Sequence, residues 1–275
     1  MQTFRTLVFS ILTALTFSLP VAAQSNAPSV DEIVHRVNYV AYYQGKDGRA
    51  QVQMQITDNQ GRKRQRSFTI LRRDVPDSES IENHAYWGEQ QMYVYFNRPA
   101  DVNKMVFMVH KKLKGDDERK LYLPALDLVK PIAAGDKRTS FVGSDYFYED
   151  VSGRSIDEDK HELLKTTDNY YVLRHTPKDP AAVEFAYYDM YVHKQSFIPV
   201  QIEFYDKNND KYRIAKALKV ETIQGYPTVT QASMENLKTG SKTEMRYSQV
   251  AYDIGIPEEV FTERYLRAPP IKYLR

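Results

Sequence analysis

The sequence predicts a mainly β protein of the α+β class: a single incomplete antiparallel β-barrel of about ten or eleven strands, with helices that cover its concave face. Two observations support this. Short runs rich in Val, Ile, Tyr and Phe, separated by turn residues, follow one another from residue 49 to residue 252. A helical period appears in only a few segments, and a sheet of this many strands twists and curls on itself.

The N-terminal segment has the pattern of a cleavable signal peptide over residues 1–23. Arg5 is its only charged residue, an apolar run follows over 7–17, and small residues precede the cleavage site that we expect after Ala23. Because this run is shorter than the roughly 20 residues of a membrane-spanning helix, cleavage is favoured over anchoring. Residues 24–275 are then expected to form one domain. The chain has no cysteine, so we expect neither a lipid anchor nor a disulfide.

A helix is predicted over residues 29–43. Ser29 and Glu32 have the spacing of a capping box, and apolar residues then recur at helical spacing, among them Val37 and Val40. Gly45 ends the helix. Its single apolar face must pack on another element, and the inner face of the sheet is the expected partner.

From residue 49 the period changes to two, since Val52, Met54 and Ile56 alternate with glutamines up to a turn at 58–61. A hairpin is therefore expected, with its return strand at 66–72. The further strands expected from composition are at residues 91–96, 104–110, 119–123, 127–132, 169–175, 185–193, 200–206, 211–221, 228–237 and 243–252. Two other segments, 141–151 and 257–266, are helical candidates.

The sequence carries little evidence of catalysis. The six histidines are scattered singly, so no metal site is predicted, and no nucleotide-binding or serine-hydrolase motif is present. We predict no cofactor. Carboxylates cluster at 149–150 and at 157–159, where a solvated loop or helix end is the simpler interpretation. The near balance of 38 basic and 36 acidic residues predicts no nucleic-acid partner, whereas the basic run 62–66 allows transient contact with a membrane surface.

Aromatic residues are in excess, with 21 Tyr and 12 Phe, and several clusters place them on both faces of a strand. This favours an apolar cavity for a ligand. Our candidates for its lining alternate along neighbouring strands and are Trp87, Tyr93, Tyr95, Phe107, Leu121 and Leu123.

Several segments resemble the outer-membrane lipoprotein-sorting protein family, the relatives of the LolA and LolB carriers. One such segment is 140–151, and its most specific part runs from Phe141 through Gly143, Ser144 and Asp145 to Asp150. The resemblance extends over nearly all of the chain after the signal peptide, through 95–99, 119–124, 129–132, 190–199, 234–236 and 256–262.

The resemblance implies an incomplete barrel that holds acyl chains in its concavity. It also implies a periplasmic carrier, not an enzyme, that binds an acylated lipoprotein or another lipid for transport to the outer membrane, often together with an RND-type exporter of the inner membrane. Two alternatives stay open: a regulatory module that docks on an exporter without cargo, and an envelope hydrolase that uses acidic residues. For a carrier, we expect a lid formed by 29–43 and 141–151, with Val37, Val40, Phe141, Asp145, Tyr146, Phe147, Tyr148, Glu149 and Asp150 as its candidate residues.

Overall fold

The computed structural model describes residues 27–75, 88–113 and 115–275. The predicted signal peptide, 1–23, and the candidate cavity residue Trp87 lie outside these ranges. Within them, no helix combines the length and the apolar character needed to cross a membrane.

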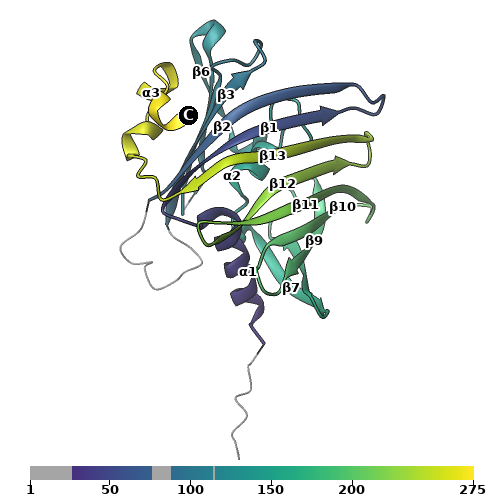
Figure 1. Ribbon diagram of the computed structural model, residues 1–275. Coiled ribbons are helices and arrows are strands. Elements are labelled where there is room, and N and C mark those ends of the chain that lie inside the picture. The colour runs from purple at the N-terminus through teal and green to yellow at the C-terminus, as the bar shows by residue number, and fades with distance from the viewer. Residues whose placement is uncertain (1–26, 76–87, 114) are drawn as a thin grey trace, which may run out of the picture.

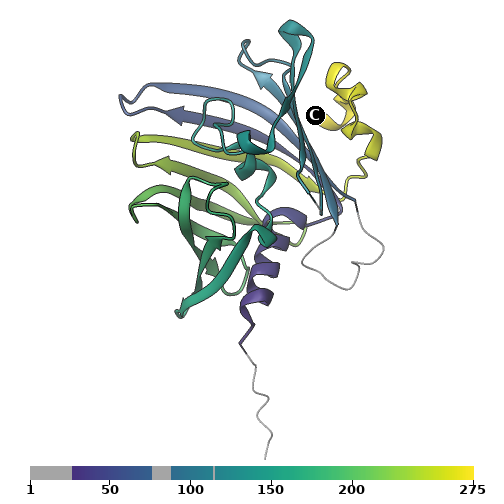
Figure 2. The same cartoon turned by 180° about the vertical axis from the view of Figure 1, so that it is seen from behind.

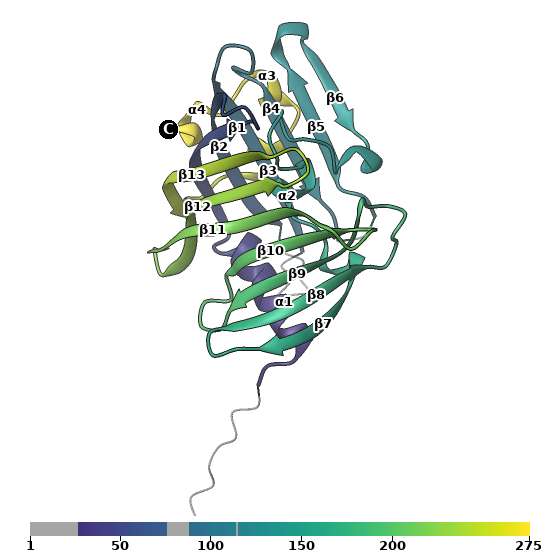
Figure 3. The same cartoon turned by 90° about the vertical axis from the view of Figure 1, so that its right-hand side faces the viewer.

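The described strands form one antiparallel sheet of 13 strands (Figure 1). They are β1 (Asp47–Thr57), β2 (Lys63–Val75), β3 (Glu89–Arg98), β4 (Val106–Lys111), β5 (Glu118–Leu123), β6 (Leu128–Ile132), β7 (Asp159–Thr166), β8 (Tyr170–Pro177), β9 (Phe185–His193), β10 (Pro199–Asp206), β11 (Lys211–Ile223), β12 (Tyr226–Asn236) and β13 (Ser241–Tyr252). The sheet stays open, with β6 and β7 as its edges (Figure 3). The prediction of a mainly β, incomplete antiparallel barrel is confirmed.

The sheet has more strands than the ten or eleven predicted. Each strand segment expected from composition is present, and β7 is the strand that lies outside all of them. Its residues are largely polar and mostly half-buried or exposed, as suits an edge strand with solvent on one side. Such a strand lacks the clear alternation that identifies a half-buried one.

Two meanders build the sheet, one from β1 to β6 and one from β7 to β13. They are joined where β1 pairs with β13, from Gly48 opposite Tyr252 to Thr57 opposite Lys242. The strands closest to the two ends of the domain therefore lie side by side in the middle of the sheet.

The helical elements are short. They comprise α1 (Val30–Asn38), which continues as a π-helical turn (Tyr39–Tyr43), α2 (Tyr148–Ser152), α3 (Arg264–Arg267) and α4 (Ile271–Leu274), with short 3₁₀ turns at Pro124–Leu126, Ala134–Asp136, Ile156–Glu158 and Glu258–Phe261. The helix predicted at 29–43 is present, and the Glu32 amide donates to the Ser29 hydroxyl at 3.1 Å. The 141–151 segment is helical only in its last turn.

The sheet is packed on both faces. Inside its curve, α2 and the loop before it pack on Phe68, Phe96 and Phe107, while α1 packs on β7 to β9 (Figure 2). On the outer face, Leu266 of α3 and Leu274 of α4 cover a second cluster that includes Leu71, Tyr93 and Met108. The middle of the concave face is left for a cavity.

Candidate functional site

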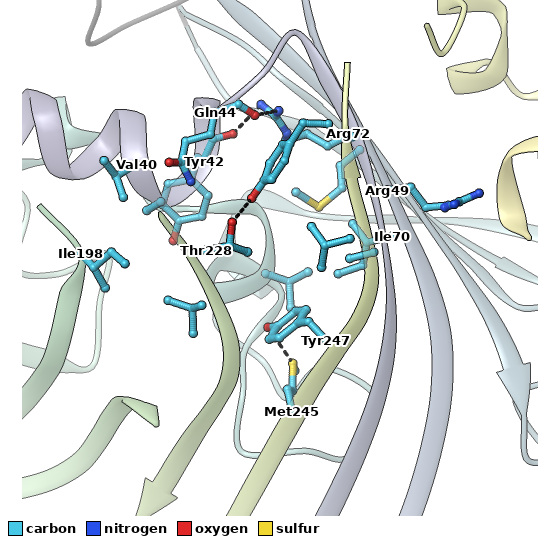
Figure 4. Close-up of a pocket in the computed structure, with 18 of the residues that line it drawn as sticks. Val40, Tyr42, Gln44, Arg49, Ile70, Arg72, Ile198, Thr228, Met245 and Tyr247 are labelled. Carbon is cyan, nitrogen blue, oxygen red and sulfur yellow. Dashed lines mark hydrogen bonds between the residues drawn. The ribbon is translucent and has the colours of Figure 1, made fainter. Parts of the chain in front are cut away.

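The concave face contains a cavity of about 330 Å³, within the range of small-molecule sites. The π-helical turn, strands β1 to β3, β12 and β13, and α2 contribute to its walls. In Figure 4, Val40, Ile70 and Tyr247 face a common space, whereas Arg49 points away from it. The period of two explains this lining, because Ala50 continues the inward row of Val52 and Met54 along β1.

A branch of about 190 Å³ extends the cavity towards β10 to β12, and the two share the side chains Tyr42, Tyr146 and Asp150 in their walls. Four tyrosines line this space: Tyr42, Tyr146, Tyr247 and Tyr252. Burial raises the pKa of Tyr247 to about 12, that of Tyr146 well above its ordinary value, and those of Tyr42 and Tyr252 as well. All four hydroxyls are therefore uncharged at neutral pH.

Tyr42 lies where the cavity and its branch meet, and Gly153 is what permits this position. A Cβ on Gly153 would lie 2.9 Å from Cζ of Tyr42, and the backbone there has φ +83°. The Nζ of Lys111 is 5.3 Å from the centroid of the Tyr42 ring and donates to the Gly153 carbonyl at 3.3 Å. Burial lowers the pKa of Lys111 to about 8.

The C-terminal end of the π-helical turn is fixed by side chains of β2 and β3. Arg72 donates to the carbonyls of Tyr42 at 2.7 Å and Gly45 at 2.9 Å, and the Gln90 amide donates to the Tyr42 carbonyl at 2.8 Å. Helix α1, which precedes the turn, packs through Ile33, Val34 and Val37 against apolar side chains of β8 and β9. The C-terminal end of the 29–43 segment is thus held by hydrogen bonds, whereas the helix before it is held by apolar packing.

The 141–151 segment is anchored in the inner core. Phe141 is fully buried, and its ring lies 5.5 to 6.0 Å from those of Phe68, Phe96, Phe107 and Tyr148. Asp145 accepts hydrogen bonds from the Thr243 hydroxyl at 2.7 Å and from the Ser241 hydroxyl. This segment forms the floor of the cavity.

Buried ion pairs fix α2 further. Glu149 pairs with Lys137 at 2.9 Å, with Arg138 at 2.5 Å and with Arg154 at 3.4 Å. Burial alone raises the pKa of Glu149, but the field of Arg138, Lys137 and Arg154 lowers it to about 2. Asp150 forms an ion pair with Arg213. A carboxyl held ionised by three cations is unsuited to donate a proton, which argues against the hydrolase alternative at this cluster.

The candidate cavity residues separate onto two faces. Phe107 lies in the inner core, with Leu121 and Leu123 packed against it, while Tyr93 and Tyr95 lie in the outer cluster. The hydroxyl of Tyr93 donates to the Tyr265 carbonyl of α3 at 2.7 Å. None of these five lines the cavity or its branch. The assignment of Tyr93 and Tyr95 to the concave face is thus corrected, because β3 is buried on both faces.

The candidate lid residues lie closer to the cavity. Val40, Tyr146 and Asp150 line it, whereas Val37 and Glu149 line a smaller compartment beside it. The rest support the floor from outside both spaces and are Phe141, Asp145, Phe147 and Tyr148.

Sequence reasoning missed several residues that build the site: Tyr42, Gly153, Arg213 and Tyr247. For Tyr42 one signal was available in the sequence. It comes directly after Ala41, the last residue of the apolar face of the predicted helix, and before the end of that helix at Gly45. Arg213 carried no signal, because a basic residue in a strand is most often exposed, whereas this one is buried against the Phe147 ring at 4.1 Å.

Comparison with known proteins agrees with this architecture. Residues 88–268, more than half of the chain, match a family model described as that of an uncharacterized protein. No curated protein sequence matches the chain. A DUF1329 family protein from Desulfovibrio piger is 27% identical with a TM-score of 0.74, and the alignment covers 85% of this chain and 96% of that one.

Two further structures are similar. A putative outer membrane lipoprotein-sorting protein domain from Vibrio parahaemolyticus is 24% identical with a TM-score of 0.75, over 85% of this chain and 97% of that one. A LolA superfamily protein from Nitrosomonas europaea is 17% identical with a TM-score of 0.65, over 87% and 100% of the two chains. The chain belongs to the family whose model matches residues 88–268, and it has the LolA-like fold that the resemblance in the motifs implied.

Proposed function

We propose that the protein is a periplasmic carrier that holds the acyl chains of a lipoprotein or another lipid in its concave cavity for transfer to the outer membrane, without catalysing a reaction. The observation that carries the proposal is the cavity itself, which is lined mainly by apolar side chains and lies next to a helix that covers the sheet. A docking module without cargo would be expected to fill its concavity with its own side chains.

For a carrier of acyl chains, releasing the cargo is more difficult than binding it. At about 0.8 kcal/mol per buried methylene, a chain of about 15 methylenes gains on the order of 12 kcal/mol before ordering costs. A lid that exchanges its own apolar contacts for contacts with the cargo lowers the net affinity.

The contacts favour α1, not the 141–151 segment, as the moving part of the lid. Arg72 and Gln90 hold the turn at Tyr42 and Gly45, whereas α1 rests on apolar contacts with β7 to β9. The turn then acts as a hinge about which α1 moves away from β8 and β9. The 141–151 segment stays in place as the floor.

The partners follow from the family resemblance. An RND-type exporter of the inner membrane supplies or accepts the cargo, and the basic run 62–66 makes the transient contact with a membrane surface. Of that run, Arg64 and Arg66 already donate to the carbonyls of Gly143 at 3.3 Å and Val142 at 3.2 Å. Arg62 and Lys63 are exposed, and although Arg62 also pairs with Asp58 at 2.7 Å, these two residues are the part of the run that we assign to the contact.

Native mass spectrometry of the mature protein, purified from its own periplasm without detergent, tests the proposal. We expect a stoichiometric acylated adduct, identified by lipid extraction in parallel. Ala50→Phe, which fills the cavity from β1, should lose the adduct, whereas Gln53→Phe on the exposed side of the same strand should keep it. A bare protein that also takes up no added phospholipid or lipopeptide would favour the exporter-docking module instead.

A further inference from the structure

A smaller compartment of about 120 Å³ adjoins the main cavity, and Ala41, Tyr42, Asp150 and Pro199 take part in the walls of both. It lies between α1, which contributes Val34 and Val37, and strands β8 to β10. Unlike the main cavity, it is also lined by a pair of histidines, His161 of β7 and His175 of β8.

The hydrogen bonds of this pair define the tautomer of each neutral ring. Nε2 of His161 lies 2.9 Å from the Ile156 carbonyl oxygen, which can only accept, so that nitrogen carries a proton. Nδ1 of a neutral His161 is then an acceptor, and it lies 2.8 Å from Nδ1 of His175, which must donate. Nε2 of His175 is left with a free lone pair.

His175 is held in this orientation and kept neutral. Its ring stacks on Tyr188, with the centroids 4.5 Å apart and the planes 3° from parallel. Burial, followed by the neighbouring His161, lowers the pKa of His175 to about 3. The residue is only 3% exposed, and its Nε2 has no hydrogen-bond partner among the described residues. A buried acceptor without a donor is unfavourable in the empty protein.

The charges around the compartment do not suit an anionic group. Two guanidinium groups line it, and both are already paired: Arg138 with Glu149 and Glu184, and Arg154 with Glu158 and Asp159. The carboxylates of Glu149 and Asp150 also take part in the lining. A phosphate or carboxylate placed here would meet these negative charges without gaining an unpaired cation.

We propose that this compartment receives an uncharged hydrogen-bond donor of the cargo, an O–H or amide N–H group next to the acyl chain, and that this group donates to Nε2 of His175. The proposal rests on the carrier function above and specifies the cargo as a neutral acylated amphiphile. A hydroxyl of an acylglycerol and an amide of an acylated peptide share this chemistry, and the test below separates them.

The test compares four probes that share a palmitoyl chain. Monopalmitoylglycerol offers hydroxyl donors, N-palmitoylglycinamide offers amide donors, methyl palmitate offers only acceptors, and palmitoyl lysophosphatidate carries charge. One neutral hydrogen bond corresponds to a difference of about threefold to tenfold in Kd. We expect at least one of the donor probes to bind more tightly than methyl palmitate by that factor, and the tighter of the two identifies the donor.

His175→Phe keeps an aromatic ring against Tyr188 and removes the nitrogen, so the advantage of the donor probe should disappear while methyl palmitate binds as before. His193→Phe is the matched control, since His193 lies on β9 outside both cavities and bonds to Ser196 at 2.9 Å. Should His175→Phe fail to fold, imidazole ¹⁵N spectra of the wild-type protein decide: His175 Nε2 should be unprotonated, and its resonance should shift when the donor probe binds.

Equal binding of the donor probes and methyl palmitate, unchanged in His175→Phe, would overturn the donor site and leave the carrier function standing. Tightest binding of lysophosphatidate would also overturn it. If none of the probes binds, the carrier function fails together with the site.

Discussion

At the scale of single residues, we expect the loss of the Glu149 ion pairs to change the stability of the protein strongly. Its side chain is 2% exposed and meets three cations, so Glu149→Gln removes the carboxylate that they share and leaves each with its other partners, among Glu158, Glu184 and Asp159. We expect a loss of about 3 kcal/mol in the free energy of unfolding, measured by urea denaturation, because this is the free energy that corresponds to the lowered pKa of the carboxyl. Glu158→Gln is the control, because Glu158 pairs with Lys137 and Arg154 but is 37% exposed, and it should lose about 1 kcal/mol or less.

The same carboxyl predicts how stability depends on pH. Its pKa is lowered from 4.5 to about 2 in the folded protein, so its contribution is complete above pH 4.5 and is lost as the pH falls towards 2. In this interval Glu149→Gln should lose less stability than the wild type. Parallel curves for the two proteins would contradict the ion-pair account.

Gly153 and Gly225 offer a second comparison between residues. Both have positive φ, +83° and +86°, so Ala at either position should be destabilising by about 1 to 2 kcal/mol. At Gly153 the new Cβ would also collide with the Tyr42 ring. At Gly225 no atom lies within 4 Å of the position of the new Cβ. Gly153→Ala should therefore weaken the binding of an acyl probe, measured by fluorescence titration, and Gly225→Ala should leave it unchanged.

At the scale of the element, the prediction concerns which part of the lid moves. Hydrogen exchange of the amides in α1 should change when lipid is loaded, because α1 rests on the sheet through the apolar side chains of Ile33, Val34 and Val37. The amides of 141–152 should not change, since Phe141 and Asp145 tie that segment to the sheet and Glu149 ties it to Arg138. Changes confined to 141–152 would place the moving part there instead.

The elements also show what the sequence could predict. The helix at 29–43 and the hairpin at 58–61 were predictable because caps, turns and periodicity are local. The face on which Tyr93 lies was not, because its partner Tyr265 is 172 residues away and β3 is buried on both sides. The 141–151 segment was expected to be part of the lid, and its anchoring was not predictable, because it depends on Arg213 and Thr243, which come from strands distant in the sequence.

At the scale of the whole molecule, we expect the outer face of the sheet to contribute to stability and the concave face to bind the cargo. Leu266 is 1% exposed in the outer cluster, so Leu266→Ala should lower the free energy of unfolding by about 2 to 5 kcal/mol. Occupancy of the cavity, measured by native mass spectrometry at a temperature where the variant stays folded, should not change. Ile271→Ala, at a position that is 45% exposed, should alter neither quantity.

The pairing of β1 with β13 has a consequence for how the chain folds. Met54 meets Met245 across this ladder, so the contact that joins the two meanders closes a loop of almost the whole domain. Such non-local pairing makes folding slow, because the entropy of loop closure is lost before the contacts form. Until β13 has been synthesised, β1 presents an unpaired edge, and the N-terminal meander is open to pairing with other chains. The nascent protein is therefore expected to need a chaperone until its last long strand is available.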